Sequence, residues 1–276
     1  MIILFIGDIV GQPGRACVAR HLPELRERYH PDVVLANAEN AAAGLGVTPQ
    51  LLKELHKMGI DGFTLGNHTW RRPELVKGID GLGHVVRPAN FPENNPGRGS
   101  MVLRLADGRK VGVLNLVGRV FMEPARCPFL TADAELETLR QETRVILVDM
   151  HAEATAEKIA LGWYLDGRCS AVIGTHTHAQ TADGWILPNG TAYLSDAGMC
   201  GPYYSVIGVE TEKVTQRFLT GMPAKFEVAG GPCVFSGVVV DVDDETGRAI
   251  RIETILIRET EADLPDEEAS RMPEKR

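Results

Sequence analysis

Five short apolar runs that each end in polar residues most constrain the fold of this chain. They read MIILFIGD, VVLANAEN, GFTLGNH, VILVDMH and AVIGTHTH. Their length, their β-branched residues and the Gly or Pro beside them are typical of buried strands rather than helices. Strands of a parallel sheet end at one edge, where open α/β folds bind ligands, so these polar ends should converge. The converging residues are Asp8, Glu39, Asn40, Asn67, His68, His151, His176 and His178.

Helical segments separate the first three runs. Residues 15–29 have helical spacing of apolar side chains, and Pro23 is predicted to kink or divide that helix. A second helix is predicted between a Thr48 cap and Gly59. This alternation of strands and helices predicts right-handed crossovers and a parallel sheet.

The later part of the chain should contain antiparallel strands. Residues 100–105 and 110–116 flank Asp107-Gly108, which is a hairpin signal. Further helices are predicted at 132–141 and 155–165, and further strands at 184–187, 191–195, 235–242 and 250–257.

We therefore predict an α/β fold, a layered α-β-β-α sandwich of two mixed sheets flanked by helices. The chain has no linker-like stretch and no fixed repeat, so residues 1–258 should form a single domain. Residues 259–276 are charged and contain Pro, and we predict a partly disordered C-terminal tail there.

Charge and composition exclude several classes of partner. The net charge of -8 argues against an extended nucleic-acid duplex, whose phosphates require clustered Lys and Arg. No apolar run reaches membrane-spanning length, and the first run lacks the basic residues of a signal peptide. The five cysteines are odd in number and lack C-x-x-C spacing, which indicates neither a disulfide framework nor a zinc ribbon. We expect a cytoplasmic protein without a membrane partner.

The polar strand ends predict a metal site. His176 and His178 face the same side of an extended segment, although such a pair alone is more simply explained as two hydrogen-bonded loop histidines. The acidic, amide and imidazole groups at the other strand ends favour a metal, because polar groups beside a core need hydrogen bonds or an ion. Oxygen and nitrogen ligands without thiolates suit Mn, Fe or Zn.

The candidate ligands are too numerous for one ion. Two ions about 3.5–4 Å apart, bridged by a carboxylate and a hydroxide, would use them and would clamp both oxygens of a phosphoryl transfer. If Asp8 and Glu39 are the only anionic protein ligands, two divalent ions retain a surplus of about one positive charge. A phosphate ester is therefore the expected substrate.

An ordered set of motifs from the first strand to about Pro202 resembles a known family. The motifs are GDIVG with Gly14-Arg15, AENA with Gly44 and Gly46, GNHTW, Asn115-Leu116 with Gly118-Arg119, Asp149 with HAEAT and Glu157-Lys158, and GTHTH with QTAD. As a set they resemble the calcineurin-like metallophosphoesterases, and more closely the YmdB-like branch of bacterial cyclic-nucleotide phosphodiesterases. Val10 and Glu39 stand where the wider superfamily has a ligating His and a bridging Asp, and both departures are features of this branch.

This resemblance implies a role for each strand-end residue. Asp8 and His178 would hold a first metal, and Asn67, His151 and His176 a second, with Glu39 bridging the two. Asn40 would lie against the first metal or its water, and His68 would be a general acid that binds no metal.

The resemblance also implies the reaction. A metal-bound hydroxide would attack phosphorus in line and hydrolyse 2′,3′-cyclic nucleotides to 3′-nucleotides, with 3′,5′-cyclic nucleotides as further substrates. The implied cofactors are two divalent or mixed-valence transition-metal ions, foremost Fe or Mn, with Zn as an alternative. A homo-oligomer is expected.

Two other classes of function remain open at this point. One is a metallophosphatase or another metal-dependent hydrolase; amidohydrolases, however, usually carry His-x-His on the first strand, and here it comes late. The other is a nucleotide-sensing regulatory protein, against which the complete ligand set argues. Asp149 could orient a ligating His. Phosphate contacts are considered for Arg15, Arg71, Arg72, Arg87 and Arg119, and the substrate-binding residues are otherwise unknown.

Overall fold

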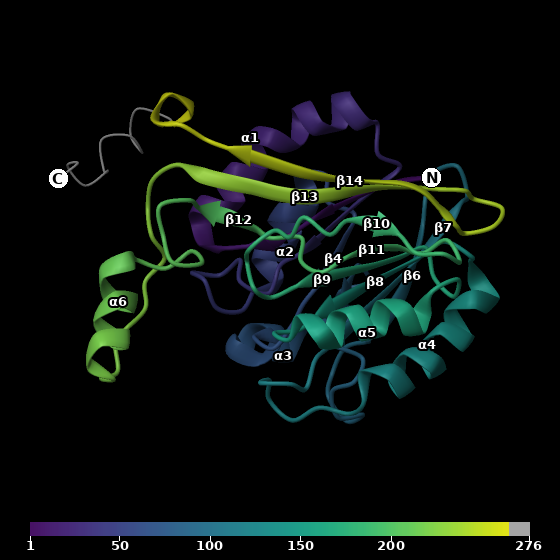
Figure 1. Ribbon diagram of the computed structural model, residues 1–276, viewed down its shortest axis with the longest axis horizontal. Coiled ribbons are helices and arrows are strands. Elements are labelled where there is room, and N and C mark those ends of the chain that lie inside the picture. Colours follow the sequence, from purple (N-terminus) through teal and green to yellow (C-terminus); the bar gives the residue numbers. More distant parts are fainter. Residues whose placement is uncertain (265–276) are drawn as a thin grey trace.

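Two mixed sheets form the centre of the protein in a computed structural model that describes residues 1–264 (Figure 1). Within these residues the first sheet contains β1 (Ile2–Ile6), β2 (Asp8–Ile9), β3 (Val33–Asn37), β4 (Gly62–Thr64), β5 (Val85–Val86), β12 (Met199–Pro202), β13 (Cys233–Val242) and β14 (Ala249–Arg258). The second contains β6 (Ser100–Arg104), β7 (Lys110–Val117), β8 (Ile146–His151), β9 (Ala171–Thr175), β10 (Trp185–Ile186) and β11 (Ala192–Leu194).

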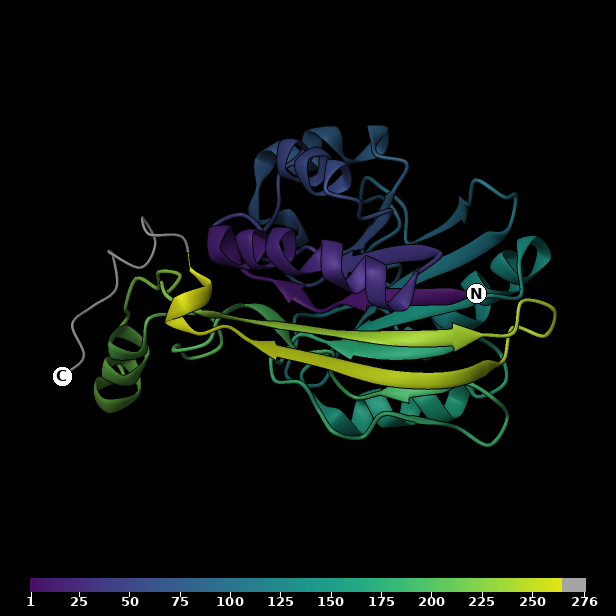
Figure 2. The same ribbon diagram turned by 90° about the horizontal axis from the view of Figure 1, so that it is seen from above.

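Helices cover the outer faces of both sheets (Figure 2). The first sheet packs against α1 (Gly11–Tyr29), α2 (Pro49–Lys57) and α3 (Pro73–Gly78), and the second against α4 (Pro128–Glu142) and α5 (Thr155–Leu165). A separate apolar layer fills the space between the sheets, with Phe5 from β1 and Leu147 from β8 among its buried residues. The predicted α-β-β-α sandwich of two mixed sheets is confirmed.

The five apolar runs end at neighbouring edges of two sheets rather than at one edge of a single parallel sheet. Strands β1, β3 and β4 are parallel neighbours in the first sheet, whereas β8 and β9 are parallel neighbours in the second. The sheets stack with these ends side by side, so residues from both reach the same region. The predicted convergence holds, but across a sheet interface.

Most predicted elements are present, and α1 is longer than expected. It runs without interruption from Gly11 to Tyr29, so the predicted division at Pro23 is wrong. Pro23 faces solvent while Leu22 and Leu25 beside it are buried. Water can satisfy the carbonyl that Pro23 leaves without a donor, and the buried face keeps the helix on the sheet.

Besides α3 and β5, a strand and a helix later in the chain were not predicted. Strand β12 lies in the Gly-rich loop beyond residue 195, and α6 (Thr211–Thr220) extends away from the sandwich (Figure 1). Val214 is the buried residue of α6, so this helix lacks the apolar stripe that marks a core helix.

The chain beyond β14 is described only in part. Glu259 is buried, and a short helical turn follows at Glu261–Asp263. The rest of the predicted tail, residues 265–276, lies outside the described residues. Among residues 1–264, no helix is both long and apolar enough to cross a membrane.

Candidate metal centre

The structure brings together all eight strand-end residues predicted from the sequence. Asp8, Glu39, Asn40 and His151 are buried, and the others are partly exposed. Contacts link them into one cluster across both sheets, composed of Asp8, Glu39, Asn40, Asn67, His68, His151, His176 and His178.

One group of candidate ligand atoms surrounds Nε2 of His151. Asn67 Oδ1 lies 2.9 Å from it, and Glu39 Oε1 and His176 Nδ1 each lie 3.1 Å from it. Ligand atoms that share an ion at about 2.1 Å lie roughly 3 Å apart, so this spacing fits a metal ion.

Thr175 fixes the tautomer of His151. The Thr175 hydroxyl donates to Asp149 Oδ1 at 2.7 Å and so accepts from His151 Nδ1 at 2.9 Å. Nε2 is then the nitrogen with the free lone pair, as metal ligation requires. Asp149, predicted to orient a histidine, acts through Thr175 and is held by Asn37 at 3.0 Å. Burial raises the pKa of Asp149 to about 6.

Asp8 contains the clearest signal for a second ion. Its Oδ2 accepts from the His176 backbone N–H at 3.1 Å, but its Oδ1 is buried without a hydrogen-bond partner in the described chain. His178 Nε2 lies 3.8 Å from this oxygen. Burial raises the pKa of Asp8 because few donors replace its lost hydration. An ion between Asp8 and His178 would satisfy both groups.

Glu39 lies between the two groups. Its Oε1 is 3.1 Å from both His151 Nε2 and His68 Nδ1, and its Oε2 accepts from the His68 backbone N–H at 2.8 Å. Burial by itself raises the pKa of Glu39, but His151 and His68 outweigh it and hold that pKa well below its usual value. Gly66 allows this packing, because a Cβ there would lie 2.3 Å from His151 Nε2 and 2.5 Å from Glu39 Oε2.

Asn40 connects His68 to His178. Its Oδ1 lies 2.8 Å from His68 Nδ1, and its Nδ2 lies 3.1 Å from His178 Nε2. Asn40 Oδ1 can therefore bind a metal ion only if the side-chain amide of Asn40 rotates. His68 Nδ1 is engaged by Asn40 and Glu39, which leaves Nε2 as its free ring nitrogen.

A buried ion pair holds the His-Thr-His segment. His176 and His178 have φ values of 100° and 65°, which non-glycine residues seldom adopt. Asp196 fixes the residue between them by accepting from the Thr177 backbone at 3.1 Å and its hydroxyl at 2.8 Å. Lys158 Nζ neutralises Asp196 at 2.7 Å. Sequence reasoning did not assign these roles to Lys158 and Asp196, nor any role to Asn37 and Thr175.

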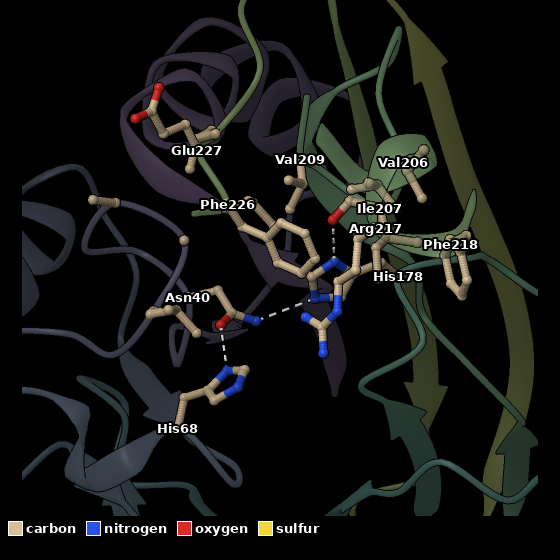
Figure 3. A pocket seen from close by; sticks show the side chains of 16 residues that line it. Asn40, His68, His178, Val206, Ile207, Val209, Arg217, Phe218, Phe226 and Glu227 are labelled. Atoms are coloured by element: carbon tan, nitrogen blue, oxygen red, sulfur yellow. Dashed lines mark hydrogen bonds between the residues drawn. The ribbon is translucent and has the colours of Figure 1, made fainter. Parts of the chain in front are cut away.

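A cavity of about 460 Å³ opens beside the cluster, and Asn40, His68 and His178 form part of its wall (Figure 3). The opposite wall comes from residues 206–228, where no site residue was predicted. Arg217 lines this cavity, whereas Arg15, Arg72 and Arg87 donate to backbone carbonyls elsewhere. Arg71 pairs with Glu123 at 3.6 Å, and Arg119 donates its backbone N–H to Glu157 at 3.0 Å.

Comparison with protein families and curated sequences gives consistent results. The family described as YmdB-like protein matches residues 4–255. A 2′,3′-cyclic-nucleotide 2′-phosphodiesterase of Bacillus subtilis is 50% identical over 259 residues, which cover 94% of this chain and 98% of the relative. A putative phosphatase/phosphodiesterase of Mycoplasma genitalium is 34% identical over 260 residues and 92% of each chain.

Solved structures share the fold. A hypothetical protein from Thermus thermophilus is 43% identical with a TM-score of 0.87, covering 94% of this chain and 100% of the other. A structure described as a novel phosphatase of Mycoplasma pneumoniae is 34% identical with a TM-score of 0.88, covering 94% of this chain and 93% of the other.

Proposed function

We propose that this chain is a metal-dependent phosphodiesterase that hydrolyses 2′,3′-cyclic nucleotides to 3′-nucleotides. The chain belongs to the YmdB-like protein family. The activity in the name of the Bacillus subtilis relative supports this substrate. The proposal rests on the buried Oδ1 of Asp8, which has no hydrogen-bond partner among residues 1–264 and lies beside a convergent set of ligand atoms. 3′,5′-Cyclic nucleotides are a further substrate class in this proposal.

The ligand atoms divide between two metal positions. In our proposal Asp8 and His178 hold the first ion, with Asn40 joining them once its amide turns. The second ion takes Asn67, His151 and His176. Glu39 would bridge the two. Its Oε1 lies 3.1 Å from His151 Nε2 and 3.3 Å from Asn40 Nδ2, and that amide nitrogen also lies 3.1 Å from His178 Nε2. We propose divalent or mixed-valence Fe or Mn, with Zn as an alternative, because the ligand atoms are oxygen and nitrogen.

When bound, such ions activate the attacking water and stabilise negative charge on the phosphoryl oxygens. The water oxygen bonds to phosphorus as the bond from phosphorus to the 2′-oxygen breaks. His68 donates a proton from Nε2 to that leaving oxygen, while Glu39 and Asn40 hold its ring through Nδ1. His68 lines the cavity and is partly exposed, as a residue that meets substrate must be.

We also propose that the enzyme acts in the cytoplasm as a homo-oligomer. All five cysteines are free, which suits a reducing compartment.

Elemental analysis and product identification test the proposal. Protein reconstituted with Mn or Fe should contain two ions per chain and convert 2′,3′-cyclic AMP to 3′-AMP. Fewer than two ions per chain would contradict the proposed centre. Faster turnover of acyl esters than of phosphodiesters would indicate another hydrolase, and tight nucleotide binding without turnover would indicate a sensor.

A further inference from the structure

The wall of the cavity opposite the metal ligands is mostly apolar and comes from one segment, residues 206–228. Val206, Ile207 and Val209 precede α6, Val214 lies on it, and Phe226 and Val228 follow it. Figure 3 shows Asn40 and His68 on one side of the cavity and Val206, Ile207 and Val209 on the other, with His178 next to Ile207. A ligand bound here would touch both the proposed catalytic groups and this apolar wall.

Close packing attaches this segment to the loops that carry Asp8 and Glu39. A Cβ on Gly11 would lie 3.1 Å from Val228, and one on Gly44 would lie 2.9 Å from it. Val228 therefore lies directly on the loops that follow two proposed metal ligands. Val209 forms isolated β-bridges with both Val206 and Val228, which ties the two ends of the segment together.

A hydrogen bond links the same segment to a proposed ligand. His178 Nδ1 lies 2.8 Å from the carbonyl oxygen of Ile207, and because a carbonyl can only accept, Nδ1 carries the proton. His178 Nε2, which lies 3.1 Å from Asn40 Nδ2, is then the unprotonated ring nitrogen that metal ligation requires. Ile207 has a φ of 48°, which is unusual for a β-branched residue. Such strained positions cluster at functional sites.

In the cavity, which Phe218 and Phe226 both line, the ring of Phe226 lies beside the cation of Arg217. The guanidinium of Arg217 lies 5.1 Å from the ring centroid of Phe226, and no carboxylate of residues 1–264 is within ion-pair distance of it. Figure 3 shows the Arg217 side chain directed toward the wall that contains Asn40 and His178. Glu227 is neutralised by Lys213 at 2.6 Å and Lys225 at 3.4 Å, so this mouth of the cavity favours an electron-rich ligand.

We propose that this cavity binds the nucleobase of the substrate, with Phe226 as its aromatic contact and Arg217 as a donor to acceptor atoms on its edge. This inference rests on the phosphodiesterase function proposed above. A flat heterocycle suits apolar walls that contain aromatic rings, and guanidinium donors match the acceptor edges of bases. The volume of about 460 Å³ lies in the range of small-molecule sites.

The test compares cyclic nucleotides with a phosphodiester that lacks a base. The value of kcat/KM is measured for the four common 2′,3′-cyclic nucleotides and for glycerol 1,2-cyclic phosphate. Stacking on an aromatic side chain contributes about 1–3 kcal/mol per base, so Phe226→Ala should lower the preference for nucleotides about 5- to 150-fold, mainly through KM. Arg217→Gln should also lower this preference, and Arg217→Lys should not restore it because lysine lacks the planar fork.

Leu219→Ala is the matched control. Leu219 is an exposed apolar residue of α6, the helix that carries Arg217, and it does not line the cavity. It should keep the wild-type preference. Phe226→Leu removes the ring but keeps apolar packing, so a folding defect is not expected in this variant. Its preference for nucleotides should fall as in Phe226→Ala. An unchanged preference in both Phe226→Leu and Arg217→Gln would overturn the assignment, as would a wild-type enzyme that shows no preference for nucleotides.

Measurements of nucleotide binding test the base site independently of the proposed phosphodiesterase activity. Calorimetry with 3′-AMP and 3′-GMP should give a Kd about 5- to 150-fold weaker for Phe226→Ala than for the wild type. If the wild type hydrolyses no phosphodiester but still shows this difference, the proposed function is wrong and the base site stands. If the enzyme is active but the Kd is unaltered, the base site is wrong and the proposed function stands.

Discussion

His68 Nδ1 and Glu39 Oε1 lie 3.1 Å apart, so the proposed general acid is in direct contact with the proposed bridging carboxylate. The same Glu39 oxygen contacts His151 at 3.1 Å. Contact with this carboxylate orients the ring of His68. His68 can therefore depend on the metal centre for its orientation without being a ligand.

Replacing His68 separates metal binding from proton transfer. His68→Ala should keep two ions per chain by elemental analysis but lower kcat for 2′,3′-cyclic AMP about 10²–10⁴-fold, which is the usual contribution of a general acid. The loss should be much smaller with bis(p-nitrophenyl) phosphate, because p-nitrophenolate leaves without a proton. An equal loss on both substrates, or a loss of metal, would rule out the role of proton donor.

Gly66 provides a test of the crowded packing around Glu39 and His151. Gly66→Ala should reduce the metal content to well below two ions per chain, because its Cβ would lie 2.3 Å from His151 Nε2. Gly83→Ala is the control, since Gly83 is exposed and a Cβ there meets nothing within 4 Å. If both variants bind metal like the wild type, the packing around His151 is looser than the structure indicates.

The strand-end residues were predictable from sequence for a physical reason. Parallel strands carry their last residues to one edge, so Asp8, Glu39 and Asn67 converge wherever the sheet forms. Their division between two sheets was not predictable, since each apolar run looks the same in either sheet. The roles of Asn37 and Thr175 were not predicted either, because each residue lies inside an apolar run. Their roles depend on contacts with Asp149 and His151, which are distant in sequence.

The cavity wall was harder to predict. Helix α6 buries Val214 but exposes Phe218 and Leu219, so its pattern resembles a surface loop more than a core helix. Its position depends on Val228 packing against Gly11 and Gly44, which are distant in sequence. The spacing of Val214 and Phe218 and the Gly221 that ends the helix are local signals of a helix there.

Lys158 stabilises the segment that carries two proposed ligands. Lys158→Met should lower the free energy of unfolding by about 3–5 kcal/mol, because it leaves the buried Asp196 carboxylate without its cation. Metal affinity should fall as well, because Asp196 holds Thr177 between His176 and His178. Urea unfolding and metal titration measure the two effects.

The double variant Lys158→Met/Asp196→Asn is the control for that experiment. Removing both charges should recover part of the lost stability, since no unpaired buried charge remains. Metal affinity should stay low if the charged form of Asp196 is needed to hold Thr177. A single Lys158→Met variant as stable as the wild type would show that the other donors to Asp196 are sufficient.

Glu259 should control stability in acid, far from the metal centre. Burial by itself raises the pKa of Glu259, but hydrogen bonds from His21, Arg20 and the Cys233 backbone outweigh it and lower that pKa to about 2. Arg20 Nε and Nη2 lie 2.8 and 2.9 Å from the carboxylate oxygens, which are fully buried. A carboxylate whose folded pKa lies below its unfolded value stabilises the fold above the unfolded pKa.

The stabilisation should therefore be complete above about pH 5. It should decline as the pH falls from 4.5, the ordinary pKa of a glutamate, toward the folded-state pKa of about 2. It amounts to roughly 3 kcal/mol, because each pKa unit corresponds to about 1.4 kcal/mol. Glu259→Gln should lower the free energy of unfolding near pH 7 and approach the wild-type value near pH 2. Urea unfolding between pH 2 and 7 measures both curves, and parallel curves for the two proteins would show that Glu259 does not titrate in this window.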